Sequence, residues 1–293
     1  MADAGSEGEA SFQGLRKYVI EAQSETIKAL LNIVSIGLAA CNRVSELIDD
    51  RSIDIDRSFA AIEANRDMIC GVKARASQVI VTAWGHVAPA KIAKRVAEIA
   101  GLPLMVYVGE PGRLIDEVLD ILTPGDIVTH CFNGKKAGSI RGTAALFAQA
   151  KQMAADGIFM DIGHGQASSD FKCARGSVVD GLLPYSISTD LHLRNIKGPV
   201  HDLATTMPKL LAVGVPFDEC IAAVTRRPPA ILGLVAENGA TPGVRAHFTL
   251  FDLAKTTVIA TDSSGNTLAP KSKFEPRMTV IGTSVEPAAR RRQ

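Results

Sequence analysis

The sequence predicts an α/β protein of the TIM-type (β/α)8 barrel class with a small β appendage at its carboxyl end. The 293 residues suit one large barrel, which usually needs about 250 residues. From residue 29 onward, short apolar runs rich in β-branched residues alternate with longer amphipathic segments, as in strand–helix repeats around a parallel sheet. Polar residues follow the later runs at intervals of 23 to 34 residues. This spacing predicts that they gather at one mouth of a barrel.

Six apolar runs have the length and composition of buried strands. The predicted strands are 29–38, 68–74, 102–109, 126–132, 157–165 and 185–191. Between them, 89–101 and 112–122 carry apolar residues at steps of three and four, which predicts helices that cover the sheet. Residues 201–234 predict a pair of helices with a Pro-Pro break and a glycine stop.

The last part of the chain has a different pattern. Residues 244–253 and 257–262 alternate like half-exposed strands of a small sheet. We therefore expect a barrel over 1–240 and, over 241–293, the carboxyl-terminal strands of a small β-sandwich followed by a charged, mobile tail.

Composition excludes several classes of function. The formal net charge is +1, so the chain lacks the basic field that captures nucleic acid. No basic start followed by an apolar run and no long apolar span is present, which argues against a membrane location. The five cysteines are odd in number and form no CxxC pair, which favours reduced thiols and a cytoplasmic protein.

Lys73 lies in GVKAR at the end of a predicted strand. A buried ammonium without a partner costs several kcal/mol, so its position requires an explanation. One explanation is an ion pair across the barrel mouth with a carboxylate such as Asp190 or Glu110. Another is that the amine is modified or acts on substrate, for example as the Schiff-base amine of an aldolase or lyase.

Other strand-end residues also have two interpretations. His130, in GDIVTHCFNGK, is either a metal ligand or a hydrogen-bonded structural residue. Asp190, in ISTDLH, can bind metal and take a proton from bound water, or it can cap a following helix. His164 and His192 can hold substrate or satisfy loop carbonyls. The chain has no GxGxxG or GxxxxGK[ST] motif, so phosphate binding at the glycine-rich DIGHGQASS is a minor alternative.

Taken in order, these segments resemble landmarks of the amidohydrolase superfamily, and most closely its deacetylase, dihydroorotase-like branch. The landmarks are GVKAR, GDIVTHCFNGK, DIGHG, ISTDLH, GPVHDLATTMPKLL and VTRRPPAILGL. The resemblance covers nearly the whole chain. It implies a metal-dependent hydrolase with one or two divalent ions, usually zinc, at the mouth of a TIM-type barrel.

The resemblance also assigns roles to residues. Lys73 matches the strand-four lysine, which carbon dioxide carboxylates into a metal ligand. His130 matches the strand-six ligand, and Asp190 matches the strand-eight aspartate that binds metal and accepts the proton of the attacking water. The implied set is catalytic Asp190; metal ligands Lys73, His130 and Asp190; and, by position, substrate-binding His164, His192, Asn133 and Tyr107.

Two features depart from the family pattern. The chain has no HxH pair, which the family carries on its first strand, so the barrel is expected to be incomplete at its amino end. Either a segment upstream supplies the strand, a partner chain completes the barrel, or the protein is an inactive relative with a retained pocket. Second, Tyr107 in MVYVGEPG stands where the family has a ligand histidine; with an unperturbed pKa near 10, tyrosine is a poor zinc ligand. One metal ion is therefore expected.

The sequence thus predicts a hydrolase that cleaves an acyl ester or amide bond of a small molecule with metal-activated water. The alternative is a metal-poor, catalytically impaired barrel that serves as a binding or scaffold protein. A sheet edge left open by a missing strand would favour a homo-oligomer.

Overall fold

The computed structural model describes residues 1–39, 41, 46–47, 49–76, 87–109, 115–234 and 241–288. The chain forms two compact units, Met1–Gly163 (unit 1) and His164–Gln293 (unit 2). Within the described ranges, no helix has the length and apolar character that crossing a bilayer requires.

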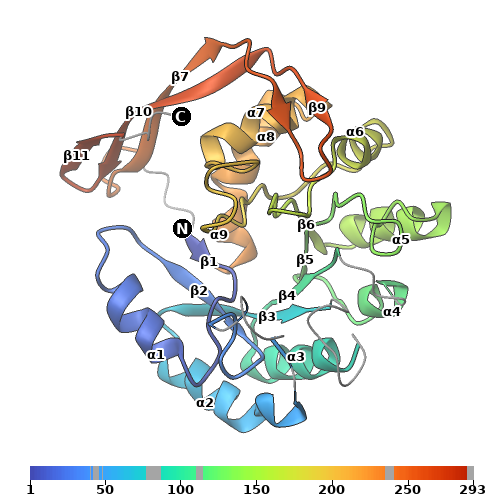
Figure 1. The fold of residues 1–293 in the computed structure, drawn as a ribbon. Coiled ribbons are helices and arrows are strands. Elements are labelled where there is room, and N and C mark those ends of the chain that lie inside the picture. Colours follow the sequence, from blue (N-terminus) through green and yellow to red (C-terminus); the bar gives the residue numbers. More distant parts are fainter. Residues whose placement is uncertain are drawn as a thin grey trace. The chain divides into compact units, whose positions relative to one another are not determined.

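Within its described residues, unit 1 is built on a curved, parallel sheet of six strands in sequential order (Figure 1). The strands are β1 (Ala2–Asp3), β2 (Lys28–Asn32), β3 (Ile69–Arg75), β4 (Leu104–Tyr107), β5 (Ile127–Thr129) and β6 (Phe159–Asp161). Lys73 pairs with Asn32 on one side and with Met105 on the other. Consecutive parallel strands joined by helices form the repeat of a (β/α) barrel, as the sequence predicted.

Helices lie on the outer side of this sheet (Figure 1). They are α1 (Phe12–Leu15), a π-helix η1 (Arg16–Ile20), a 3-10 helix η2 (Asp50–Ser52), α2 (Ile55–Ala64), α3 (Val87–Ala100), α4 (Ile115–Leu119) and α5 (Ala144–Ala155). The carboxylate of Asp54 accepts a hydrogen bond from Arg57 N and starts α2, and the Thr143 hydroxyl caps α5 in the same way. The predicted helix 89–101 corresponds to α3; part of 112–122 lies outside the described residues.

The strands are apolar almost throughout because both faces of the sheet are covered. Six consecutive residues of β3, from Ile69 to Ala74, are buried. At the start of β4 and β5, Asp126 joins the elements: its carboxylate accepts from Leu104 N at 2.9 Å and from Lys94 Nζ at 2.5 Å. This buried ion pair connects α3 to the end of the sheet at which β4 and β5 begin.

The predicted strand 29–38 is shorter in the structure, where β2 ends at Asn32. The Asn32 side chain explains the end: its Oδ1 accepts from Val34 N at 2.9 Å, and its Nδ2 donates to Gly5 O at 3.0 Å. A side chain that bonds nearby backbone in this way turns the chain out of the ladder.

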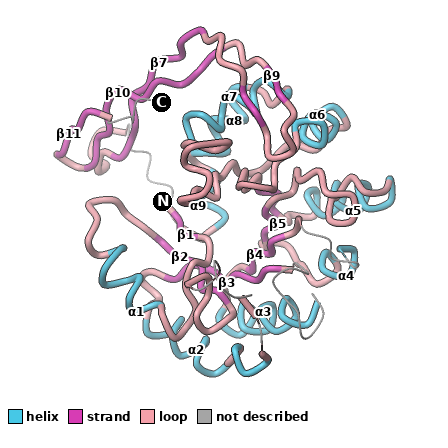
Figure 2. The backbone as a smooth tube through the Cα atoms, viewed as in Figure 1, coloured by secondary structure: helices cyan, strands magenta, loops and turns pink. Residues whose placement is uncertain are grey.

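Unit 2 contains four helices and two antiparallel sheets among its described residues. The elements are α6 (Phe171–Val179), α7 (Leu203–Val213), α8 (Phe217–Val224), α9 (Arg227–Ile231), β7 (His247–Lys255), β8 (Ala260–Thr261), β9 (Thr267–Leu268), β10 (Ser272–Ile281) and β11 (Ser284–Pro287). Between α6 and α7 the chain is mostly loop (Figure 2). Asp202 caps α7, and Gly214, with φ of +114°, ends it.

The appendage sheet has the order β11-β10-β7 and is antiparallel. Phe274 of β10 is 1% exposed and lies between Phe217 of α8 and Phe251 of β7, with ring centroids 6.2 and 4.9 Å away. These aromatic contacts fix the sheet on the helices. The division at residue 240 that the sequence suggested stays a prediction.

One predicted strand was wrong. Residues 185–191 form no continuous strand in the described structure, although the amides of His164 and Gly165 donate to the carbonyls of Ser188 and Thr189, each at 3.0 Å. The backbone of Asp190 then adopts a left-handed φ of +47°. The chain therefore leaves the extended conformation at that residue.

Candidate active site

Lys73 is buried near the carboxyl end of β3, with an exposed fraction of 5%. β3 continues to Arg75, so Lys73 precedes the last residue by two positions and shares its face of the strand. A Cβ on Gly5 would lie 2.6 Å from the Cβ and the Cγ of Lys73. Gly5 thus leaves the space that the aliphatic part of the lysine fills.

Glu46 is a buried carboxylate in unit 1 that pairs with Arg75 and Asn32. Its side chain is 2% exposed and accepts from Arg75 Nη1 at 3.2 Å and from Asn32 Nδ2 at 2.6 Å. Burial raises the pKa of the Glu46 carboxyl, while the positive charges of Arg75 and Lys73 and the bond from Asn32 oppose the rise. The sequence prediction paired Lys73 with Asp190 or Glu110. Glu110 lies outside the described residues, and within unit 1 the positive charge of Lys73 acts on the Glu46 carboxyl.

His130 follows β5 directly and is 3% exposed. Its Nδ1 lies 2.5 Å from Gly163 O, and a carbonyl only accepts, so Nδ1 carries the proton. Burial lowers the pKa of His130 well below its usual value, and the charges of Lys73, Arg75 and Lys135 lower it further against the Gly163 bond. The ring is therefore neutral, and its Nε2 lone pair, to which no described residue hydrogen-bonds, is free to bind a metal ion.

The position of His130 depends on Gly163. A Cβ on this residue would lie 2.5 Å from Thr129 Oγ1 and 2.8 Å from His130 Nδ1, and its φ of +45° is left-handed. His130 itself has a φ of +63°, which is uncommon for a residue with a side chain. Both conformations are held at the point where β5 and β6 end, where strain is often linked to function.

Two other predicted residues surround His130. The Tyr107 ring meets the His130 ring edge-on, with centroids 4.3 Å apart, and the Arg75 guanidinium lies 4.9 Å from the centre of the Tyr107 ring. The Asn133 amide donates to His130 O and to Gly138 O, each at 3.0 Å. Asn133 thus closes the loop that follows His130.

In unit 2, Asp190 lies at the surface on a loop that is fixed by Asn195. The fully buried Asn195 donates from Nδ2 to Asp190 O at 2.7 Å and accepts from His192 N at 2.9 Å. The helix-cap interpretation of Asp190 was wrong, because the next helix begins only at Leu203. His192 is exposed, and its Nδ1 accepts from Arg194 N at 3.2 Å.

His164 differs from His130 in having both ring nitrogens engaged. Its Nδ1 lies 3.1 Å from Gly165 O, and its Nε2 lies 2.9 Å from Lys209 Nζ. Burial lowers the pKa of His164 to about 4, and the Lys209 charge acts in the same direction. The loop-carbonyl interpretation of His164 therefore has a geometric basis.

The predicted residues fall into two sets. Lys73, Tyr107, His130 and Asn133 gather in unit 1, whereas His164, Asp190 and His192 belong to unit 2. That both sets face one metal ion stays a prediction.

Sequence reasoning missed five residues that hold these side chains: Glu46, Arg75, Gly163, Asn195 and Lys209. For Arg75 the signal was present, since it lies two positions after Lys73 and so on the same face. For Lys209 it was a lone cation in an apolar helix. Gly163 carried no such signal.

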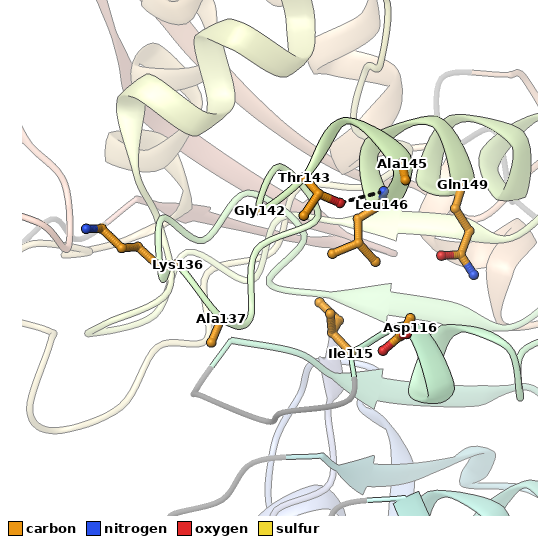
Figure 3. Close-up of a pocket in the computed structure, with 9 residues that line it drawn as sticks. All are labelled: Ile115, Asp116, Lys136, Ala137, Gly142, Thr143, Ala145, Leu146 and Gln149. Atoms are coloured by element: carbon orange, nitrogen blue, oxygen red, sulfur yellow. Dashed lines mark hydrogen bonds between the residues drawn. The ribbon is translucent and has the colours of Figure 1, made fainter.

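Unit 1 also has a pocket of about 520 Å³ (Figure 3). It lies between the first turns of α4 and α5, and its lining includes Ile115, Asp116, Thr143, Leu146 and Gln149. Neither Lys73 nor His130 lines it. The pocket is thus separate from the cationic cluster around His130.

No family model matches the chain. A curated deacetylase of Agrobacterium fabrum is 52% identical over 290 residues, which cover 99% of this chain and 71% of that protein. A curated deacetylase of Enterococcus faecalis is 34% identical over 287 residues, covering 97% of this chain and 76% of its own length. A crystal structure of a dihydroorotase superposes with a TM-score of 0.95 at 52% identity, covering 99% of this chain and 76% of that one. The chain belongs to the amidohydrolase superfamily.

Within this superfamily the chain falls in the deacetylase, dihydroorotase-like branch. A crystal structure of an adenine deaminase, 32% identical, gives a TM-score of 0.90 over 98% of this chain and 77% of that one. An L-hydantoinase of Arthrobacter aurescens shares the fold at 11% identity and a TM-score of 0.61. The predicted family, TIM-type barrel and hydrolase class are confirmed, and the scaffold alternative is not favoured.

Amidohydrolases generally depend on divalent metal ions, so the donors present are informative. Among the described residues, no three His, Cys, Asp or Glu side chains are grouped to hold a metal. No described residue hydrogen-bonds to His130 Nε2, but the charges that lower the pKa of His130 are those of Lys73, Arg75 and Lys135. In its ammonium form this cluster repels a cation, and a carboxylated Lys73 would change one positive charge into a negative one.

Proposed function

We propose that this amidohydrolase is a deacetylase-type enzyme that cleaves an acyl ester or amide bond of a small molecule. The observation that carries the proposal is the His130 ring, whose Nδ1 donates to Gly163 O at 2.5 Å while no described residue hydrogen-bonds to Nε2. That arrangement fixes the tautomer that a metal-binding imidazole needs. The identity of 52% with a curated deacetylase supports the reaction class.

We propose one divalent ion, zinc, bound by carboxylated Lys73, His130 and Asp190. Lys73 is buried, with an exposed fraction of 5%, and its carboxylation would change a positive charge into a negative one that attracts a metal ion. Tyr107, with its ring packed against His130, takes the place of a second nitrogen ligand, which supports a single ion. A bound zinc ion would polarise the acyl carbonyl and lower the pKa of a water molecule.

The protein's own groups supply the other parts of the reaction. Asp190 accepts the proton of the attacking water, and its exposed loop gives substrate access to the carboxylate. Tyr107, Asn133 and His192 are proposed to contact the substrate, and His164 is proposed to shape the substrate site through the loop that it belongs to. Arg75, which is paired with Glu46, keeps a positive charge next to Tyr107 and favours substrates with a polar or anionic group.

The remaining expectations are parts of the same proposal. All five cysteines are unpaired, and four of them are buried, which supports a reducing, cytoplasmic compartment. A homo-oligomer and a boundary near residue 240 between barrel and appendage stay proposals. Light scattering tests the first of these, and limited proteolysis tests the second.

The proposal is tested with protein reconstituted with zinc and bicarbonate and assayed on acetyl esters and N-acetyl amino acids. Lys73→Ala removes the carboxylated ligand, and added propionate offers a small carboxylate to the space that is left. We expect the variant to lose zinc and activity and to regain part of both with propionate. An unmodified, zinc-free wild type that hydrolyses the panel at the same rate would contradict the proposal.

A further inference from the structure

We propose that Lys209 is a positioning residue for Asp190 and acts through His164. Lys209 lies on α7 and is 2% exposed. Its ammonium group donates to three acceptors: His164 Nε2 at 2.9 Å, Pro199 O at 2.5 Å and Thr261 O at 3.0 Å. These acceptors use all three of its donor hydrogens.

This contact determines the state of His164. An ammonium group cannot accept a hydrogen bond, so His164 Nε2 must carry the lone pair. The proton is then on Nδ1 and is directed to Gly165 O at 3.1 Å. With both nitrogens occupied, the ring has no nitrogen left for substrate or metal. In this inference His164 is a spacer between Lys209 and its own loop rather than a substrate ligand.

The segments that Lys209 joins lie on both sides of Asp190 in the chain. Before Asp190, the carbonyls of Ser188 and Thr189 accept hydrogen bonds from the amides of His164 and Gly165, the loop that His164 belongs to. After Asp190, Pro199 O accepts directly from Lys209. One buried cation thus anchors both ends of the loop that presents the Asp190 carboxylate.

The third acceptor, Thr261 O, brings the β8–β9 hairpin into the same network. The turn of this hairpin is fixed at the His164 loop because Ser263 Oγ donates to Gly165 O at 3.1 Å. At its other side Asp262 accepts from Phe171 N at 2.7 Å, the first residue of α6. The appendage hairpin therefore supports the same loop as Lys209.

A lysine at this place is unfavourable for stability alone. Burial lowers the pKa of Lys209 to about 8, although the charge of Asp262 opposes the change. An apolar side chain of similar size would avoid this desolvation, but the three acceptors would then lose their donor. The lysine instead makes three directed hydrogen bonds to three separate segments. These bonds specify one conformation of the Asp190 loop.

The inference rests on the proposed role of Asp190, and variants can separate the two. Lys209→Met removes the three bonds. His164→Gln keeps an acceptor toward Lys209, whereas His164→Leu does not. Lys94→Met is the matched control, because Lys94 is also a buried lysine, 8% exposed, paired with Asp126 in unit 1. Asp190→Asn reports on the proposed function itself.

We expect Lys209→Met and His164→Leu each to lower kcat about 30-fold with KM changed less than about threefold, since a misplaced carboxylate affects the transition state more than binding. The double variant should lose no more kcat than either single variant. Lys209→Met and His164→Leu should each shift the acid limb of the kcat–pH profile. His164→Gln, which keeps an acceptor for Lys209, should lower kcat less than His164→Leu does. Lys94→Met should lose stability but keep kcat and the pH profile.

Several results would overturn the inference. One is a Lys209→Met enzyme with wild-type kcat and pH profile while Asp190→Asn is inactive. Another is a His164→Gln enzyme with a KM raised more than kcat is lowered, which would make His164 a substrate ligand. If Lys209→Met does not fold, the His164→Gln and His164→Leu pair decides. An Asp190→Asn enzyme with full activity would instead contradict the proposed function.

Discussion

His130 and His164 occupy similar places in the chain but differ in their chemistry. Each follows a strand of the parallel sheet by one or three residues, each is buried, and burial lowers the pKa of each. His130 has one nitrogen on Gly163 O and the other free of described partners. His164 has one nitrogen on Gly165 O and the other on Lys209.

The comparison shows that position at a strand end does not by itself make a histidine a ligand. The hydrogen bonds of the second nitrogen decide. When Nδ1–H donates to a carbonyl and no described group bonds to Nε2, as in His130, the ring can bind a cation. When Nε2 accepts a hydrogen bond from an ammonium group, as in His164, the ring can only hold its neighbours in place. The two residues therefore predict different responses to the same substitution.

The largest difference is expected when each histidine is changed to glutamine. His130→Gln should lose bound zinc and at least about 1,000-fold in kcat/KM, because a ligand and its fixed tautomer are both removed. His164→Gln should keep stoichiometric zinc. Elemental analysis and steady-state kinetics on the same preparations check both expectations. Zinc loss in the His164 variant would contradict the proposed difference between the two histidines.

The next effect concerns the packing of the His130 ring against Gly163. Gly163→Ala places a Cβ 2.8 Å from His130 Nδ1, so the ring must move, and a shift of about 1 Å costs about 100-fold in rate. Gly101→Ala is the control, since Gly101 has a similar left-handed φ of +64° with nothing within 4 Å of the added Cβ. It should lose stability only. Equal activity of the two variants would show that Gly163 does not position His130.

The pH dependence of stability gives a smaller effect. With its pKa at about 4 in the folded protein and 6.5 when unfolded, His164 takes up a proton in the unfolded chain first. The stability it contributes is present above pH 6.5 and is lost as the pH falls from 6.5 towards 4, by about 2 kcal/mol between pH 7 and pH 5. Urea unfolding at several pH values should show this slope, and His164→Gln should flatten it. The slope that remains belongs in part to His130, whose pKa is also lowered.

The smallest effect is expected at Tyr107. Tyr107→Phe keeps the ring that contacts His130 and Arg75 and removes only the hydroxyl. If the hydroxyl contacts substrate equally in ground and transition states, KM rises about threefold while kcat is unchanged. Zinc content should not change. A loss of zinc on this substitution would make the phenol a metal ligand and contradict the single-ion proposal.

The sequence predicted what depends on local pattern. The parallel sheet followed from alternating apolar runs, and Lys73 and His130 stood out as polar residues at strand ends. Features that depend on contacts between distant segments could not be read. Lys209 meets Pro199, His164 and Thr261 from three separate stretches, and Gly163 is required by a side chain 33 residues away. The predicted strand 185–191 was wrong because its apolar pattern is that of a strand, whereas the described residues form no continuous strand there and the Asp190 backbone turns at a φ of +47°.

The most direct test of the account is diffraction at the zinc edge from crystals grown with zinc and bicarbonate. We predict one anomalous peak bonded to His130 Nε2, to a carboxylated Lys73 and to Asp190. A peak bound elsewhere, or Lys73, His130 and Asp190 lying on different faces of the molecule, would contradict it.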